Sequence, residues 1–137
     1  MNKKLIFIKV CLWIGIIADL ISCIPLLFPE IAQNMYGLDN KLIVGNEYLY
    51  TSRIAATLML GWTCLLFWAV MKPVERRGVL LLTVIPVMCG LVTSSTLAVT
   101  SGFIQSVYML PVWIFNAIII IIFLTAYYFA SNLARAD

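Results

Sequence analysis

Histidine is absent from the 137-residue sequence, and charged residues make up only 11% of it, against 64% hydrophobic residues. A water-soluble domain needs far more polar surface than this, so the composition excludes a soluble protein. The missing imidazoles remove the commonest zinc ligands and the commonest general base. No Cys-x-x-Cys pair occurs, and we expect the cysteines to be small buried thiols, with no metal and no other cofactor. The cysteines are Cys11, Cys23, Cys64 and Cys89.

Long apolar runs account for most of what is present. Four of them, each of about 20 residues, cover 5–28, 51–71, 79–100 and 108–130. Each is long enough to cross a hydrocarbon core of about 30 Å as a helix, which satisfies its own backbone hydrogen bonds. None alternates apolar with polar residues, as the strands of a membrane barrel do. We therefore predict an all-α integral membrane protein, a four-helix transmembrane bundle that forms a single domain over residues 1–137.

The basic residues are unevenly distributed between the connecting segments. Only Lys41 and Arg53 fall on the side of the 29–50 loop, while seven of the nine Lys and Arg residues fall on the other side. By the positive-inside rule, both termini and the 72–77 loop face the cytoplasm, and the 29–50 loop faces outward. Loops of this kind explain the net charge of +3 without a nucleic-acid partner. The seven are Lys3, Lys4, Lys9, Lys72, Arg76, Arg77 and Arg135.

Residues 20–23, with the sequence LISC, resemble the cleavage box of a bacterial lipoprotein. The charged Asp19 directly before the box and the Ile24 and Pro25 that follow it both oppose cleavage. We therefore expect the first apolar run to remain as a spanning helix.

Several residues indicate where the helices begin and bend. Thr51 and Ser52 are candidate caps for the second helix. Pro86 lies inside the third apolar run, where it should free the carbonyl of Leu82 and bend the helix. A stripe of small residues follows at a spacing of four, which suits close packing within the bundle or a homo-oligomer contact. The stripe consists of Gly90, Ser94, Ala98 and Gly102.

The segment after the first apolar run has its own periodicity. Ile31, Met35 and Leu38 recur at helical spacing, with Gly37 near the end. This pattern predicts a short amphipathic helix that lies on the outer membrane surface or caps the bundle. The alternative is an irregular loop.

One carboxylate, Asp19, lies in the middle of the first apolar run. Facing lipid would cost it at least about 2.5–3.5 kcal/mol, so we expect Asp19 to face the bundle. Arg53 is its natural counter-ion, because a guanidinium can pair with a carboxylate through two hydrogen bonds. Polar side chains of the other three helices fall at a similar depth in the outer half. They are Arg53, Thr57, Thr93, Thr96 and Asn116.

These residues allow three interpretations. Asp19 and Arg53 form a buried structural ion pair, or the group forms an outward-facing polar pocket for the head of a lipid or small amphiphile, or Asp19 carries a proton. The leading hypothesis is a non-enzymatic binding module with that pocket. The alternatives are a small proton-coupled transporter acting as an oligomer and a lipid-modifying enzyme. The sequence shows no nucleophile–base pair, metal cluster or phosphate-binding loop, so an enzyme is the weaker interpretation.

Two stretches carry a resemblance to known proteins. They are PLLFPEIAQNMYGLD at 25–39 and RIAATLMLGWTCLLFWAVMKPVERRGVLLLT at 53–83. The chain resembles small uncharacterised bacterial four-helix membrane proteins, broadly the DoxX-like group. The resemblance implies a multi-pass protein of the bacterial cytoplasmic (inner) membrane, and no catalytic residue comes with it.

Overall fold

A computed structural model describes residues 3–38 and 44–135. These residues are 87% helical and include no strand. Four helical segments are long and apolar enough to cross a membrane, which confirms the all-α prediction and indicates a multi-pass membrane protein. They are α1 (Lys3–Leu27), α3 (Asn46–Met71), the segment Gly78–Thr100, and α6 (Ser106–Ala134).

The second spanning helix begins earlier than the sequence predicted. α3 starts at Asn46, with Gly45 as its N-cap, so Thr51 and Ser52 lie inside the helix and the capping prediction is wrong. The Thr51 hydroxyl donates to the Glu47 carbonyl (2.9 Å), and the Ser52 hydroxyl donates to the Leu49 carbonyl (3.2 Å). Such bonds to the preceding turn let hydroxyl side chains remain within a helix.

The third spanning segment is not a uniform helix. It consists of α4 (Gly78–Leu82), a π-helical stretch η1 (Thr83–Met88) and α5 (Cys89–Thr100). Pro86 lies inside η1 and has no N–H to donate to the carbonyl of Leu82, so the turn widens at that point. The expected disturbance at Pro86 is present, and it takes the form of a π-helical stretch.

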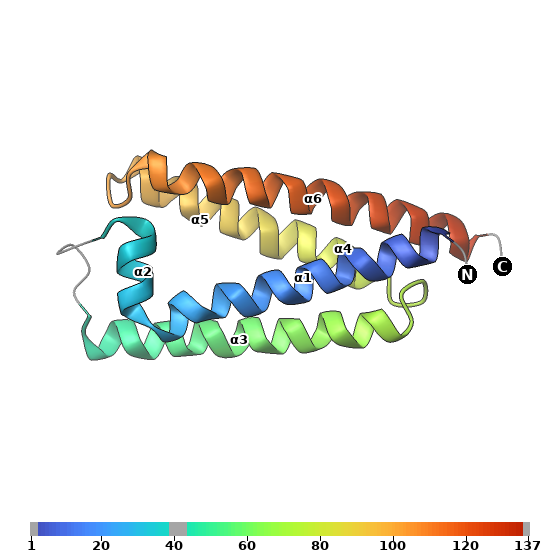
Figure 1. The fold of residues 1–137 in the computed structure, drawn as a ribbon, viewed down its shortest axis with the longest axis horizontal. Helices are drawn as coiled ribbons and strands as arrows, with labels where there is room; N and C mark the ends of the chain where they lie inside the picture. The colour runs from blue at the N-terminus through green and yellow to red at the C-terminus, as the bar shows by residue number, and fades with distance from the viewer. Residues whose placement is uncertain (1–2, 39–43, 136–137) are drawn as a thin grey trace.

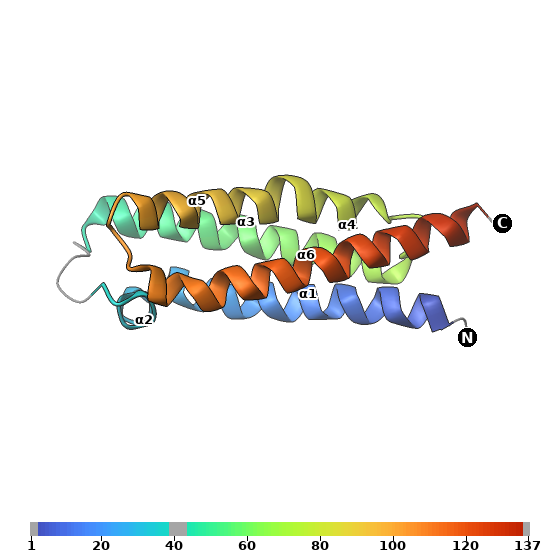
Figure 2. The same ribbon diagram turned by 90° about the horizontal axis from the view of Figure 1, so that it is seen from above.

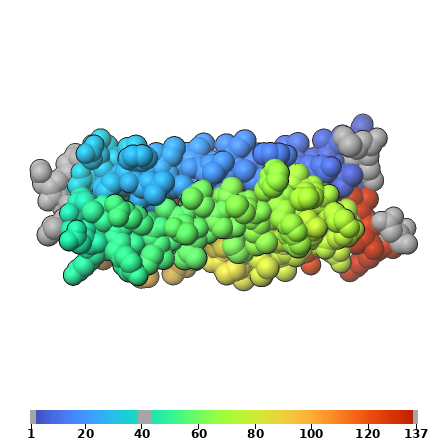
Figure 3. Space-filling model, turned by 90° about the horizontal axis from the view of Figure 1, so that it is seen from below, coloured from blue at the N-terminus to red at the C-terminus, as the bar shows by residue number. Residues whose placement is uncertain are grey.

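The helices form an elongated bundle in which α1 lies beside α3, and α5 lies beside α6 (Figure 1). Figure 3 shows α1 and α3 side by side along one whole face of the molecule. Both ends of the chain and the 72–77 loop lie at one end, which we call the termini end; Figure 2 shows the same grouping from above. The short helix α2 (Pro29–Tyr36) lies at the opposite end, the α2 end, roughly crosswise to the long helices.

Two separate apolar clusters hold the bundle together. The larger lies toward the termini end and includes Leu12 of α1, Leu66 of α3, Leu80 of α4 and Phe123 of α6, each about 1% exposed or less. The smaller lies at the α2 end, where Leu38 packs with two residues from the other side of the bundle. These two are Ile104 and Met109.

The amphipathic-helix prediction for the 29–38 segment is confirmed, with α2 capping the bundle. Pro29 occupies the first turn, and Gly37 ends the helix in the left-handed region at φ 60°. Through Leu38, α2 connects the α1–α3 pair to the α5–α6 pair.

The small-residue stripe does not pack inside the bundle as expected. Gly90 and Ser94 are exposed, and a Cβ added to Gly90 would meet nothing within 4 Å. Only Ala98 packs beside the smaller cluster, and Gly102 belongs to the turn after α5, at φ 73°. A homo-oligomer contact through Gly90, Ser94 and Ala98 stays a prediction.

Candidate functional site

The side chain of Asp19 faces the bundle, as predicted from the free-energy cost of exposing a carboxylate to lipid. Its side chain is partly buried, and its Oδ2 atom is shielded from solvent with no hydrogen-bond partner among the described residues. In a low-dielectric interior, such an orphaned acceptor loses the hydrogen bonds that it would make to water. The structure therefore holds an uncompensated polar group at a central position in α1.

The contact between Gly15 and Phe123 sets the register of α1 against α6. A Cβ on Gly15 would lie 2.7 Å from Phe123 Cζ, so the two helices touch there. Asp19 lies four residues further along α1, about 6 Å toward the α2 end, and Asn116 lies seven residues earlier in α6, about 10 Å in the same direction. Asn116 is only 5% exposed. Asp19 and Asn116 thus lie within about one helical turn of each other in depth.

Arg53 does not pair with Asp19. α3 turns Ala56 toward α1, where the Cys23 thiol donates to the Ala56 carbonyl (3.9 Å), whereas Arg53 lies outside this face and is exposed. Across the described part of the chain, the ion pair that forms is Lys72–Glu75 (3.0 Å). The predicted Asp19–Arg53 ion pair is therefore wrong, because helical rotation places Arg53 on the free side of α3.

The candidate threonines also lie apart from Asp19. Thr57, Thr93 and Thr96 are all exposed. Each hydroxyl donates within its own helix, to the carbonyls of Arg53 (2.9 Å), Cys89 (2.8 Å) and Val92 (2.7 Å) respectively. Of the six candidate ligand-binding residues, only Asp19 and Asn116 face the interior at similar depth.

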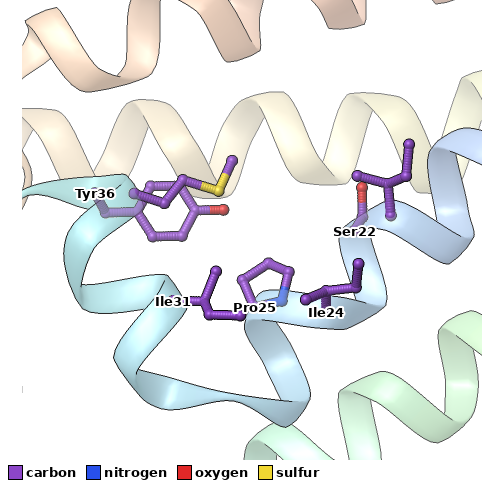
Figure 4. A pocket seen from close by; sticks show the side chains of 7 residues that line it. Ser22, Ile24, Pro25, Ile31 and Tyr36 are labelled. Carbon is purple, nitrogen blue, oxygen red and sulfur yellow. The ribbon is translucent and has the colours of Figure 1, made fainter.

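A pocket that sequence reasoning missed lies in the angle between α1 and α2 (Figure 4). Its volume is about 240 Å³, and its lining is apolar apart from the hydroxyls of Ser22 and Tyr36. The signal was present, since Pro29 starts a second helix directly after α1 and forces a sharp corner there. The lining residues are Ile21, Ser22, Ile24, Pro25, Ile31, Met35 and Tyr36.

Of the two hydroxyl side chains in this pocket, that of Ser22 is close to Asp19 along α1. Ser22 is three residues beyond Asp19 on α1, about one helical turn, so both lie on neighbouring parts of the same face. Burial raises the pKa of the Tyr36 phenol, and the nearby Tyr48 raises it further. Tyr36 therefore keeps its proton at neutral pH and can act as a hydrogen-bond donor.

Two tryptophans link neighbouring helices through hydrogen bonds, a feature that the sequence did not predict. The Trp113 indole donates to the Ser95 hydroxyl (2.8 Å) and joins α6 to α5. The Trp62 indole donates to the Thr83 hydroxyl (3.2 Å) and joins α3 to η1. A buried indole N–H needs an acceptor, so serines and threonines in the neighbouring helix were the available signal.

The described residues contain no group of three or more acidic, cysteine or histidine side chains that could hold a metal ion. No protein-family model, curated protein or solved structure matches the chain. The resemblance to the DoxX-like group therefore stays a prediction.

Proposed function

We propose that this chain is a non-enzymatic binding protein of the bacterial cytoplasmic membrane that holds a small amphiphile at the α2 end. The observation that carries the proposal is the buried, unpartnered Oδ2 of Asp19, which lies one helical turn along α1 from Ser22 in the lining of the pocket between α1 and α2. A ligand with hydrogen-bond donors would satisfy this oxygen at the least cost to the fold.

The pocket's lining indicates the class of ligand. Ile21, Ile24 and Met35 suit an alkyl chain, while Ser22 and Tyr36 suit a polar head. At about 240 Å³ the pocket is smaller than a typical drug-sized site, so it accommodates one end of a molecule. We therefore propose a single-chain amphiphile whose hydroxyl or primary-amine head reaches toward Asp19.

The proposed orientation places the α2 end outside the cell. It is supported by the grouping of both termini with the 72–77 loop at one end, where seven of the nine basic residues gather in the sequence. A binding site at the α2 end then opens to the outer leaflet or to the outside.

The binding test compares two probes on the protein in phosphatidylcholine nanodiscs. Decylamine and decyltrimethylammonium have the same chain and charge, but only the primary amine has N–H donors. Native mass spectrometry should show one bound decylamine, much weaker binding of the quaternary amine, and loss of the preference in Asp19→Asn. Ser131→Ala is the matched control, because Ser131 Oγ is also a buried side-chain oxygen without a partner in the described residues and lies near the end of α6.

Equal binding of the two probes, or unchanged binding in Asp19→Asn, would overturn the proposal. The orientation has its own test, which uses a membrane-impermeant maleimide on cells carrying single cysteines in a cysteine-free background. Glu30→Cys in α2 should react on intact cells, and Glu75→Cys in the 72–77 loop should react only after permeabilisation. The reverse labelling pattern would show that the α2 end faces the cytoplasm and would overturn the proposed orientation.

A further inference from the structure

We propose that the free face of α3 binds an anionic phospholipid, with Arg53 holding its phosphodiester and a shallow strip below Arg53 receiving an acyl chain. This site is separate from the pocket between α1 and α2, and it does not depend on what that pocket binds. Arg53 favours such a ligand by its depth in the membrane, by its lack of a carboxylate partner among the described residues and by the surface around it.

Arg53 lies at the depth where lipid headgroups meet hydrocarbon. α3 has 26 residues, so it is about 39 Å long and exceeds a hydrocarbon core of about 30 Å. Met71 is the last residue of α3 and precedes the charged 72–77 loop. Counting back about 20 residues from Met71 places the other hydrocarbon boundary next to Arg53.

The guanidinium of Arg53 has no carboxylate partner in the described structure. It is exposed, and the ion pair found among the described residues joins Lys72 to Glu75 instead. An arginine at the edge of the hydrocarbon is stabilised by an anion, and the planar guanidinium matches two oxygens of a phosphate.

The surface around Arg53 is open, with a shallow depression between side chains of α3 alone. A depression of about 250 Å³ is lined by Tyr50, Arg53, Ile54, Thr57 and Leu58, which come from successive turns of α3. Tyr50 is 71% exposed, and its phenolic hydroxyl adds a second donor for a phosphate. The depression therefore presents a cation and a donor on an otherwise apolar lining.

Below the depression a narrow strip of small side chains runs along α3, bordered by Leu60 and ending at Trp68, both of which are exposed. Thr57, Gly61 and Cys64 follow Arg53 at intervals of four, four and three residues, which keeps them on one side of a helix. A Cβ on Gly61 would meet nothing within 4 Å, and Cys64 is exposed. An acyl chain hanging from a phosphate at Arg53 would lie along this strip.

A second copy of the chain is the rival occupant, because Thr57 and Gly61 have the spacing of close helix pairs in membranes. Two copies inserted in the same orientation hold their Arg53 side chains at the same depth. A helix pair through this face would therefore bring like charges together at the edge of the hydrocarbon, where they repel each other. An anionic lipid has the complementary charge, so the structure favours the lipid.

The test is a native mass spectrometry titration of the detergent-purified protein with phosphatidylglycerol and with phosphatidylcholine of the same chains. Arg53→Gln should raise the Kd for phosphatidylglycerol about five-fold, the usual contribution of one basic residue to binding an anionic membrane. Gly61→Leu should weaken binding of the same lipid by filling the strip. Phosphatidylcholine should bind more weakly and respond little to Arg53→Gln.

Two matched controls isolate the site. Arg135→Gln removes one positive charge near the C-terminus, and Gly90→Leu adds the same side chain to an exposed glycine of α5. Neither should change the affinity for phosphatidylglycerol. Equal losses in Arg53→Gln and Arg135→Gln, or no loss in Arg53→Gln, would overturn the proposal.

Two further outcomes separate this site from its alternatives. A dimer in the wild-type spectrum that Gly61→Leu abolishes would make the second copy the occupant and overturn the lipid proposal. Asp19→Asn, the variant for the α1–α2 pocket, should leave the phosphatidylglycerol affinity unchanged. Each site can therefore fail its test while the other one passes.

Discussion

Gly37, which ends α2, lies directly against the ring of Tyr108 in α6. A Cβ on Gly37 would clash with Tyr108 Cε2, at a separation that real Cβ atoms essentially never show. The same glycine adopts φ 60°, which L-residues with side chains rarely accept. Two independent constraints thus require glycine at the point where α2 meets the opposite side of the bundle.

Gly37→Ala should lower stability by about 1–3 kcal/mol, because it combines a steric clash with an unfavourable backbone conformation. Thermal unfolding followed by tryptophan fluorescence gives the measurement. Adding Tyr108→Ala should recover the part of the loss that is due to the clash and leave the backbone part. Full stability of Gly37→Ala alone would show that α2 does not press on α6.

The contact of Gly15 in α1 with Phe123 in α6 gives a second prediction. Gly15→Val should destabilise the bundle by about 1–3 kcal/mol, since the added atoms meet the Phe123 ring. Phe123→Leu in the same background should restore part of the loss by making room. If the effects of the two substitutions on the free energy of unfolding simply added, this would contradict a contact between Gly15 and Phe123.

The bond between Trp113 and Ser95 should contribute modestly to stability. Ser95→Ala should cost about 0.6 kcal/mol, the average for a hydrogen bond between spanning helices, and should shift the Trp113 emission. Ser94→Ala is the matched control, because Ser94 is the adjacent residue and is exposed. Equal effects of the two variants would contradict the interhelical bond.

Asp19 should lower stability in the absence of ligand. Since its buried Oδ2 has no partner in the described residues, Asp19→Leu removes an uncompensated polar group and should raise the unfolding temperature of the ligand-free protein. The same variant should lose amphiphile binding. A clear fall in stability would indicate instead that Asp19 supports the bundle through a partner.

Arg76 should anchor the 72–77 loop to the end of α3. Its guanidinium lies 3.8 Å from the centre of the Trp68 ring and donates to the Trp68 carbonyl. Arg76→Gln should cost about 0.5–1 kcal/mol and change the Trp68 fluorescence. Arg76→Lys should recover only part of this, because an ammonium cannot stack as a planar group. An unchanged spectrum in Arg76→Gln would contradict the stacking.

Apolar length predicted the four spanning segments well, because each run must match the membrane thickness. It did not predict that α3 begins at Asn46, since polar residues ahead of Thr51 extend the helix beyond the apolar run. Depth along the chain correctly placed Asp19 and Asn116 at a similar level. Depth could not give rotation about each axis, so the same reasoning wrongly paired Asp19 with Arg53.

The pocket between α1 and α2 was missed for a different reason. The pocket depends on the angle between α1 and α2 at Pro29. The hydropathy of the sequence indicates that α1 ends there but does not give this angle. The indole bonds of Trp62 and Trp113 likewise depend on which helices are neighbours, which a single sequence does not specify.

The π-helical stretch η1 changes the helical phase between α4 and α5. A π-helical stretch contains one residue more than the corresponding α-helical turn. This extra residue rotates all the following residues by about 100° about the helix axis. α4 buries Val79 and Leu80, whereas α5 has no buried residue. A one-residue deletion within 83–88 would rotate the hydroxyl-rich surface of α5 to a new direction. The direction in which this surface of α5 faces in the membrane therefore depends on one extra residue in η1.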